Sequence, residues 1–400
     1  MLPELGSAPK HRVALVECLA LALTVAASPV VTVRDGLVTL PFAKRVNFTG
    51  SASLLSRDRD RVHYLKQLAK TRTTSKPSTD AEDAVVSISA ENQAVSYVVN
   101  AGVGSPPTTY SLLVDTGSSN TWVGAGRAYV RTSSSVKTGD SVSAEYGTGS
   151  FSGTEFTDTV TLAPGLVITN QFIGVASTSS GFEGIDVTNN LFSQESIPQN
   201  LVVVSFEPAT LDGITNGELT FGGTDSSKYT GSIHSTPLTT TSPASYYWGI
   251  DESITYGALG TSILTKTAGI VDTGTTLVLI ASDAFSRYQK ATGAVMNENT
   301  GLLRLTKAQL ANLQSLFFRI DGATYEFTAN AQLWPRALNA EIGGDDNSIY
   351  LAVSNLGTPT GEGLDFINGQ AWLERFYSVY DTGNQRMGFA TTPFTYATTN

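Results

Sequence analysis

The chain has 400 residues, a formal net charge of −10 and only 15% charged residues. This length is large for one hydrophobic core, so two domains, or one domain behind a removable leader, are expected. The only cysteine, Cys18, lies in the N-terminal apolar segment, which excludes a disulfide framework, a Cys-rich metal site and a thiol nucleophile in the rest of the chain. Short apolar runs that end at Gly, Asn, Asp or Pro predict a mostly β protein.

Residues 1–28 have the pattern of a secretory signal peptide. The basic stretch "KHR" precedes the apolar run "VALVECLALALTVAASPV", and small residues near Ala26 offer a cleavage site. A membrane anchor is the alternative, but the run is shorter and more interrupted than a spanning helix requires, and Glu17 weakens it further. We therefore expect a secreted, extracellular protein with no membrane anchor in its mature form.

Residues 29–83 read as a basic pro-segment. They include the helix-like stretch "SRDRDRVHYLKQLAK" and the linker-like stretch "TRTTSKPSTD". Up to Asp80 there are 12 Lys and Arg against 6 Asp and Glu, a charge of +6, and the remainder has 13 against 29, a charge of −16. Opposite charges predict that the segment docks on the body and that acid weakens the docking, although a solvated charge run is the plainer interpretation. A body of −16 also argues against a nucleic-acid partner.

The histidines of this chain do not favour a histidine-based catalytic or metal site. His11 and His63 would leave with the leader and pro-segment, and His234 would remain alone. A Ser-His-Asp triad or a His-based zinc site needs partners that are then missing. The acidic pair Asp345 and Asp346 lacks the alternating ligand spacing of a calcium loop. No metal or cofactor is expected, and the chemistry must come from carboxylates, hydroxyls and backbone groups.

Two copies of one motif supply the carboxylates. "LLVDTGSSNTW" delivers Asp115 at the end of an apolar run, and "AGIVDTGTTLVLI" delivers Asp272 in the same way. Glycine allows a tight turn after each aspartate, and the hydroxyl residues can hydrogen-bond its carboxylate. One Asp-Thr-Gly is a common loop tripeptide, but two that are more than a hundred residues apart predict a duplicated lobe with one aspartate from each half.

Two carboxylates at hydrogen-bonding distance cannot both ionise cheaply, so the pair holds one proton over an acidic range. The ionised aspartate can then take a proton from a trapped water while the protonated one polarises a carbonyl group. The predicted reaction is hydrolysis of a peptide bond by water without a covalent intermediate. Two carboxylates also suit a glycosidase, but a glycosidase needs no paired Asp-Thr-Gly turns.

From Ala84 onward the sequence resembles the pepsin-like aspartic endopeptidases, in particular the secreted fungal acid proteases of the polyporopepsin type. The stretches "YVVNAGVGSPPTTYSLLVDTGSSNTWVG", "AEYGTGSFSG", "AGIVDTGTTLVLIASDAF" and "FINGQAWLERFYSVYDTGNQRMGFA" carry the resemblance. It implies a mostly β, bilobal fold with the active-site cleft between an N-terminal lobe over 84–235 and a C-terminal lobe over 236–400. It also implies a monomer that cleaves protein or peptide substrates and is held inactive by its own pro-segment.

The resemblance assigns Asp115 and Asp272 as the catalytic pair. It implies a flap whose tip is Tyr146, with Trp122 beneath it and backbone contacts to substrate from Gly147 and Thr148. The residues that would support the pair belong to the two turns, namely Thr116, Gly117, Ser118, Thr273, Gly274 and Thr275. Ser118 and Thr275 would bond the outer carboxylate oxygens, and Thr116 and Thr273 would brace the two loops.

The chain departs from this family in one place. Each lobe should have a hydrophobic-hydrophobic-Gly strand end beside its catalytic turn, and "FING", which ends at Gly369, supplies the C-terminal copy. The N-terminal copy should follow "GFEGID", but the chain runs from Asp186 directly into "VTNNLFSQ". A coding segment left out of the sequence, a natural shortened form, or a variant that fills the gap differently would each explain this. Loss of an inner strand exposes backbone and apolar groups, which favours the first two.

Two other functions stay open. A catalytically impaired pepsin-like protein that only binds peptides would account for the missing segment, whereas the two intact Asp-Thr-Gly turns favour catalysis. A carbohydrate-binding β protein would explain the Ser, Thr and Gly content and little else. The natural substrate, the pH optimum and the cleavage sites of the leader cannot be inferred from the sequence.

Overall fold

The computed structural model describes residues 32–34, 37–46, 53–74, 95–116, 121–125, 127–146, 149–180, 184–185, 188–209, 211 and 214–399. The predicted signal peptide lies outside these ranges. The prediction of a mostly β protein is confirmed, since three sheets account for most of the described elements. No helix in the described ranges is long and apolar enough to cross a membrane.

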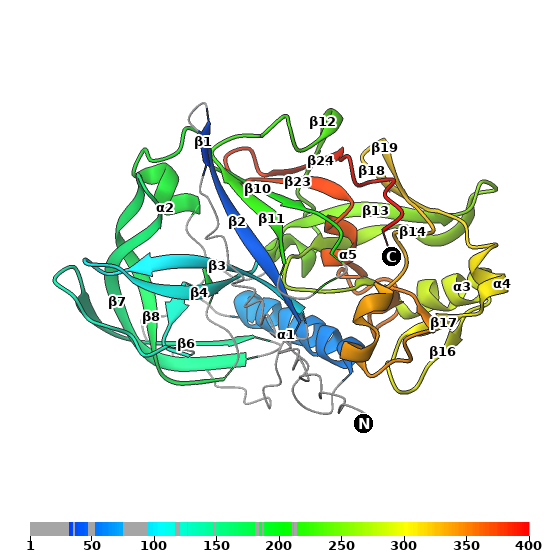
Figure 1. Cartoon of the computed structure of the whole chain (residues 1–400), viewed down its shortest axis with the longest axis horizontal. Coiled ribbons are helices and arrows are strands. Elements are labelled where there is room, and N and C mark those ends of the chain that lie inside the picture. The colour runs from blue at the N-terminus through cyan, green and yellow to red at the C-terminus, as the bar shows by residue number, and fades with distance from the viewer. Residues whose placement is uncertain are drawn as a thin grey trace, which may run out of the picture.

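The largest sheet has 14 strands and runs through the whole molecule (Figure 1). Its main path is β12 (Thr230–Pro237), β24 (Arg386–Thr391), β23 (Phe376–Asp381), β10 (Leu201–Phe206), β11 (Thr215–Phe221), β2 (Leu37–Val46), β3 (Val95–Val103), β7 (Gly149–Ala163), β8 (Leu166–Ser180) and β5 (Trp122–Val123). Strands β1 (Thr32–Arg34), β4 (Thr108–Val114), β6 (Val136–Tyr146) and β9 (Gly184–Ile185) join it at the side.

The C-terminal half forms two further sheets. The seven-stranded sheet has the order β19 (Ala323–Phe327), β18 (Leu316–Ile320), β13 (Gly249–Tyr256), β14 (Thr261–Val271), β22 (Phe366–Asn368), β15 (Val278–Ile280) and β21 (Val353–Asn355). The three-stranded sheet has β16 (Val295–Met296), β17 (Leu303–Leu305) and β20 (Ile349–Tyr350). The short helices are α2 (Thr188–Ser193), α3 (Ser282–Thr292), α4 (Lys307–Leu310) and α5 (Gln370–Leu373).

Strand β2, which belongs to the predicted pro-segment, is an inner strand of the large sheet. It pairs antiparallel with β11 on one side and with β3 on the other. Leu40 and Phe42 are buried, and the Phe42 ring meets Tyr97 and Phe206 edge-on. The predicted pro-segment therefore contributes to the hydrophobic core through β2.

Helix α1 (Leu54–Thr74) lies across the centre of the molecule, between the lobe on the left and the lobe on the right in Figure 1. Val62, Leu65 and Ala69 recur at helical spacing and are buried. They pack in one cluster with residues of the C-terminal half, including Tyr247 and Leu277. This apolar stripe fixes the rotation of the helix, so the polar side chains of its first two turns are held against the space between the lobes.

The two lobes repeat one arrangement around their aspartates. Strand β14, which ends just before Asp272, pairs in parallel with β22. Strand β4, which ends just before Asp115, pairs in parallel with β9. The register is equivalent in the two lobes. Ile270 and Val271, the last residues of β14, pair with β22, and Leu113 and Val114, the last residues of β4, pair with β9. The gap after Asp186 therefore leaves a two-residue strand in the place where the C-terminal lobe has "FIN".

The expected lobe boundary at residue 235 falls inside β12, a strand that pairs with β24 near the C-terminus. His234 lies on this strand and is exposed. Residues 84–94, where the mature N-terminus is expected, lie outside the described ranges.

Candidate active site

Asp115 and Asp272 come together at the ends of β4 and β14. Both are buried, with 4% and 0% of their surface exposed. They are delivered by strands of different sheets, so only the packing of the two lobes brings them into one site.

The guanidinium of Arg61, on α1, bonds both carboxylates. Nη2 lies 2.5 Å from Oδ1 of Asp115 and 2.8 Å from Oδ1 of Asp272, Nη1 lies 3.2 Å from Oδ2 of Asp115, and Nε lies 2.6 Å from Oδ2 of Asp272. All four carboxylate oxygens thus accept from one side chain whose own exposure is 1%. The planar fork of arginine suits such bidentate pairing, which a lysine could not reproduce.

The fit of Arg61 depends on Gly274. A Cβ atom at this position would lie 2.4 Å from Cζ of Arg61 and 2.8 Å from Oδ1 of Asp115. Any side chain here would push the guanidinium out of the site. Gly274 also donates its backbone N–H to Oδ1 of Asp272 at 3.2 Å.

The turns are braced to one another across the lobe boundary. The backbone N–H of Thr116 donates to Oγ1 of Thr273 at 3.0 Å, and the backbone N–H of Thr273 donates to Oγ1 of Thr116 at 3.1 Å. The Thr273 hydroxyl in turn donates to the carbonyl of Val114 at 2.9 Å. These reciprocal bonds hold the two aspartates in a fixed relation.

The environment of Asp272 favours its ionised form. Burial alone would raise the pKa of Asp272, but the charge and hydrogen bonds of Arg61, the Thr275 hydroxyl at 2.6 Å and the Gly274 N–H together lower it below its usual range. With Arg61 in place this carboxylate is held as an anion.

A second residue of α1, Asp58, fastens the helix to the C-terminal turn. Its carboxylate accepts the backbone N–H groups of Thr276 at 3.2 Å and Leu277 at 2.9 Å. Burial raises the pKa of Asp58 to about 7, although these two hydrogen bonds and Arg61 oppose the rise. The two residues Asp58 and Arg61, one helical turn apart, thus contact both sides of the Asp272 turn.

Other ion pairs join basic residues of the predicted pro-segment to acidic residues of the remainder of the chain. Lys44 on β2 bonds Glu374 at 2.6 Å in a buried pair, and Lys66 on α1 bonds Glu362 at 2.9 Å. The Tyr97 hydroxyl also donates to Glu374, at 3.1 Å.

The expected flap is described only in part. Trp122 is fully buried and packs against Val142 of β6 and Ala176 of β8, so it lies under the strand that leads to Tyr146. The side chain of Tyr146, and Gly147 and Thr148, lie outside what the structure describes. The same holds for Gly117 and Ser118 in the N-terminal turn.

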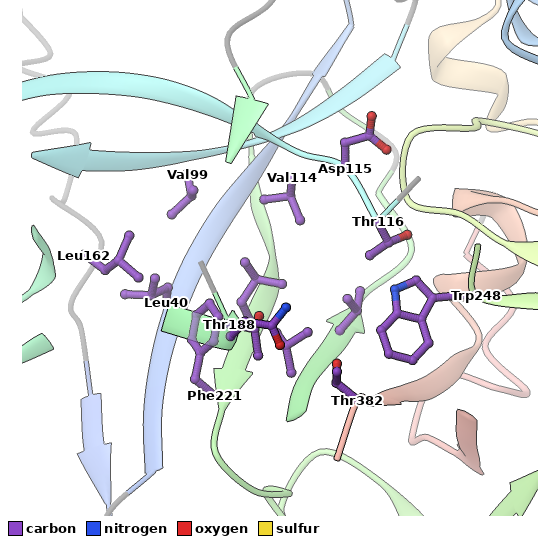
Figure 2. Close-up of a pocket in the computed structure, with 14 residues that line it drawn as sticks. Leu40, Val99, Val114, Asp115, Thr116, Leu162, Thr188, Phe221, Trp248 and Thr382 are labelled. Atoms are coloured by element: carbon purple, nitrogen blue, oxygen red, sulfur yellow. The ribbon is translucent and has the colours of Figure 1, made fainter. Parts of the chain in front are cut away.

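The support behind the two aspartates is unequal. Behind Asp272, the carbonyl of Asn368 accepts the Asp272 N–H at 3.2 Å, and Nε2 of Gln370 donates to the Thr273 carbonyl at 2.9 Å. Behind Asp115 there is a cavity of about 220 Å³ that reaches Val114 and Thr116 (Figure 2). The shortened N-terminal lobe therefore keeps the parallel strand pair but not the full packing beneath the turn.

The two cross-braced turns lie within a stretch of the chain that matches a known protein family. Residues 96–392 match the model of the eukaryotic aspartyl protease family. The chain belongs to this family. The prediction of an aspartic-type endopeptidase is thereby confirmed.

Individual relatives extend over most of the chain. Polyporopepsin from Irpex lacteus is 64% identical over 339 residues, which covers 78% of this chain and 99% of that protein. Gastricsin from Cavia porcellus is 31% identical over 330 residues, which covers 74% of this chain and 80% of that protein. The crystal structure of the aspartic proteinase from Irpex lacteus superposes with a TM-score of 0.74 at 65% identity, covering 76% of this chain and 96% of that one. The predicted bilobal pepsin-like fold is confirmed.

The alignment with polyporopepsin also bears on the gap after Asp186. It has 339 positions, whereas 78% of this 400-residue chain is about 312 residues. About 27 aligned positions therefore have no residue from this chain, in line with a segment that the relative has and this aspartyl protease lacks.

Arg61 and Asp58 are the functional residues that the sequence did not reveal. The stretch "SRDRDR" offers three arginines and two aspartates, and their charge says nothing about which one reaches the catalytic turns. The sequence feature that could have identified them is the helical spacing of the apolar residues Val62, Leu65 and Ala69, because Asp58 and Arg61 lie on the same face of the helix. Among the described residues no group of three or more His, Cys, Asp or Glu side chains is arranged to hold a metal ion.

Proposed function

We propose that this aspartyl protease is a secreted endopeptidase made as a zymogen, in which Asp115 and Asp272 activate water and α1 blocks them until acid releases it. The observation that carries the proposal is the Arg61 guanidinium, which bonds all four oxygens of the two carboxylates. A group that fills the site and satisfies both aspartates leaves neither of them free for water or substrate.

The mechanism starts when Arg61 leaves. Two buried carboxylates that face each other without a cation cannot both remain ionised, so the pair takes up one proton. A water bound between them loses a proton to the ionised aspartate and attacks the scissile carbonyl carbon, while the protonated aspartate donates a hydrogen bond to the carbonyl oxygen. Breakdown of the tetrahedral intermediate returns the proton to the leaving amine. The braces between Thr116 and Thr273 keep the carboxylates in place through these steps.

Acid is the expected trigger because the segment is held by carboxylates. Acid that protonates the two catalytic carboxylates removes the partners of Arg61. The buried pairs matter most, since exposed ion pairs contribute little. Residues 29–83 would then leave as the pro-segment, and the mature protein would consist of the lobes over 84–235 and 236–400. Peptide and protein chains are the proposed substrates, and the mature enzyme is proposed to act as a monomer outside the cell.

A second candidate is a pepsin-like protein that binds peptides without cleaving them. The observation that favours it is the cavity behind Asp115, which leaves one of the two catalytic turns with less support than the other. A loosely held Asp115 would bind a peptide in the cleft and fail at the chemical step, since a misplacement of about 1 Å can cost about a hundredfold in rate.

The test is acid conversion of the purified full chain, followed by mass spectrometry and N-terminal sequencing. The proposal expects loss of the pro-segment at acid pH and cleavage of an added hydrophobic peptide. In Asp115→Asn, self-conversion and peptide cleavage should both be absent. If the wild-type chain loses its pro-segment to an added protease, stays folded and binds the peptide without cleaving it, the binding protein is the correct assignment.

A further inference from the structure

The cavity behind the Asp115 turn has no part in the proposed reaction. It measures about 220 Å³ and is lined mainly by aliphatic and aromatic side chains of four neighbouring strands, β2, β3, β10 and β11. Leu40, Val99, Val204 and Phe221 form its apolar walls, and each is at most 4% exposed. In Figure 2 the Asp115 carboxylate points away from these side chains. The cavity thus borders Asp115 itself, on the side of the turn away from its carboxylate.

The related lobe shows what such a space normally contains. At the C-terminal turn the backbone of Gly369 packs so closely that a Cβ atom there would lie 2.5 Å from the Thr275 carbonyl oxygen. Gln370 reaches the Thr273 carbonyl from the same side, and Trp372 of α5 is fully buried. In the part of the chain that the structure describes, the N-terminal turn has the two paired residues of β9 in the corresponding place. The cavity is therefore a site in which packing atoms are missing, with walls formed by neighbouring strands of the large sheet.

We propose that this cavity is a binding site for a small aromatic molecule. A cavity of about 150 Å³ lined by aliphatic and aromatic side chains stays dry and binds benzene, and this one is larger. Water would gain few hydrogen bonds here, since nine of the fourteen lining residues are apolar and the polar ones are Asp115, Thr116, Thr188, Asn189 and Thr382. The rings of Phe221 and Trp248 favour an aromatic guest through edge-to-face contacts. The guest would occupy the space next to Val114 and Thr116 and stiffen the turn that carries Asp115.

The test is thermal unfolding of the full chain with benzene as the probe. The full chain is needed because Leu40, on β2, forms one wall. We expect a saturable rise in Tm, about 1–3 °C at ten times the dissociation constant. The polar molecule 1,4-dioxane, of similar size, serves as the control for effects of added solvent and should give no saturable rise.

Variants on β10 show whether the effect arises in the cavity. Val204→Phe fills it, and Val202→Phe, which changes another lining residue, serves if the first does not fold. Val203→Leu is the matched control, because Val203 points to the other side of β10 and packs with Tyr377 and Val379. The proposal expects the benzene effect to persist in Val203→Leu and to vanish in the filled variant. No rise in the wild-type chain, or an equal rise in the filled variant, would overturn it.

Discussion

Nη2 of Arg61 lies 2.5 Å from Oδ1 of Asp115, and the same nitrogen lies 2.8 Å from Oδ1 of Asp272. One buried cation is thus shared by two buried carboxylates, and removal of any one of the three groups takes charge-assisted hydrogen bonds from the others. Removing one partner of such a group costs about 3–5 kcal/mol, because it leaves an unpaired charge in the interior.

Arg61→Ala should therefore loosen α1. We expect conversion to begin at higher pH than in the wild-type chain and to proceed faster, measured by gel or mass spectrometry after a pH jump. Arg61→Lys should lie between the two, since an ammonium group cannot bond four oxygens in one plane. Arg59→Ala is the matched control on the same helix, because among the described residues Arg59 donates to the Asn355 carbonyl, at 2.8 Å, and to neither catalytic carboxylate. Equal conversion rates for Arg61→Ala and Arg59→Ala would contradict a blocking role for Arg61.

Asp58 should make docking of α1 weaker at neutral pH. Its pKa is raised to about 7 from an ordinary value of 3.8. A raised pKa means that its contribution to stability is complete below about pH 4 and is lost as the pH rises through about 7. Asp58→Asn should remove this loss, so the Tm of the variant should fall less than that of the wild-type chain between pH 5 and 7. Asp346→Asn, at an exposed position of the C-terminal half, should leave the wild-type profile unchanged.

The pKa of Asp272 is shifted in the opposite direction to that of Asp58, so its effect on stability depends on pH in the opposite way. Its pKa is lowered, so the stability that it contributes with Arg61 is present above its ordinary value and is lost as the pH falls through the lowered pKa. With Asp58 this places the tightest docking near pH 4, and conversion should accelerate below that pH. A maximum of zymogen stability at neutral pH would show that one of the two signs is wrong.

Glu252 should make the C-terminal lobe less stable as the pH rises toward and above neutral. It is 1% exposed, and burial raises its pKa to about 8 against one hydrogen bond from Asn368 at 2.8 Å. Its stabilising contribution is complete below about pH 4.5 and is lost as the pH rises through about 8, an effect of order a few kcal/mol. Glu252→Gln should flatten the fall in Tm over this range. Asp251→Asn, one residue earlier on β13, is the control, and a Glu252→Gln profile that falls as steeply as the control would refute the prediction.

The two threonines that brace the turns should contribute unequally to the free energy of unfolding. The Thr273 hydroxyl accepts from the Thr116 N–H and donates to the Val114 carbonyl, while the Thr116 hydroxyl accepts the N–H of Thr273. Thr273→Val should cost about 1–3 kcal/mol of unfolding free energy and Thr116→Val about half of that. Denaturant unfolding measures both, and Thr273→Ser should restore most of the loss. If both valine variants are equally stable, the bond to Val114 has no energetic weight.

The sequence predicted the fold and the aspartates because both depend on local patterns. An apolar strand that ends in Asp-Thr-Gly is visible in a few residues, and its repetition around Asp272 indicates a duplicated lobe. Arg61, Asp58 and Gln370 were not predicted, because their roles depend on contacts with residues far away in the chain. The two-residue strand β9 was also not predicted, because Gly184 and Ile185 have no strand signal of their own and pair with β4, which is far away in the chain.

The most direct test of the catalytic assignment separates chemistry from maturation. The wild-type chain, Asp115→Asn and Asp272→Asn are each freed of the pro-segment by an added protease, checked for folding, and mixed with a hydrophobic peptide at acid pH. We expect the wild-type chain to cleave the peptide and both variants to lose at least about a thousandfold in kcat with little change in peptide affinity. Cleavage by either variant at the wild-type rate would contradict the assignment of Asp115 and Asp272 as the catalytic pair.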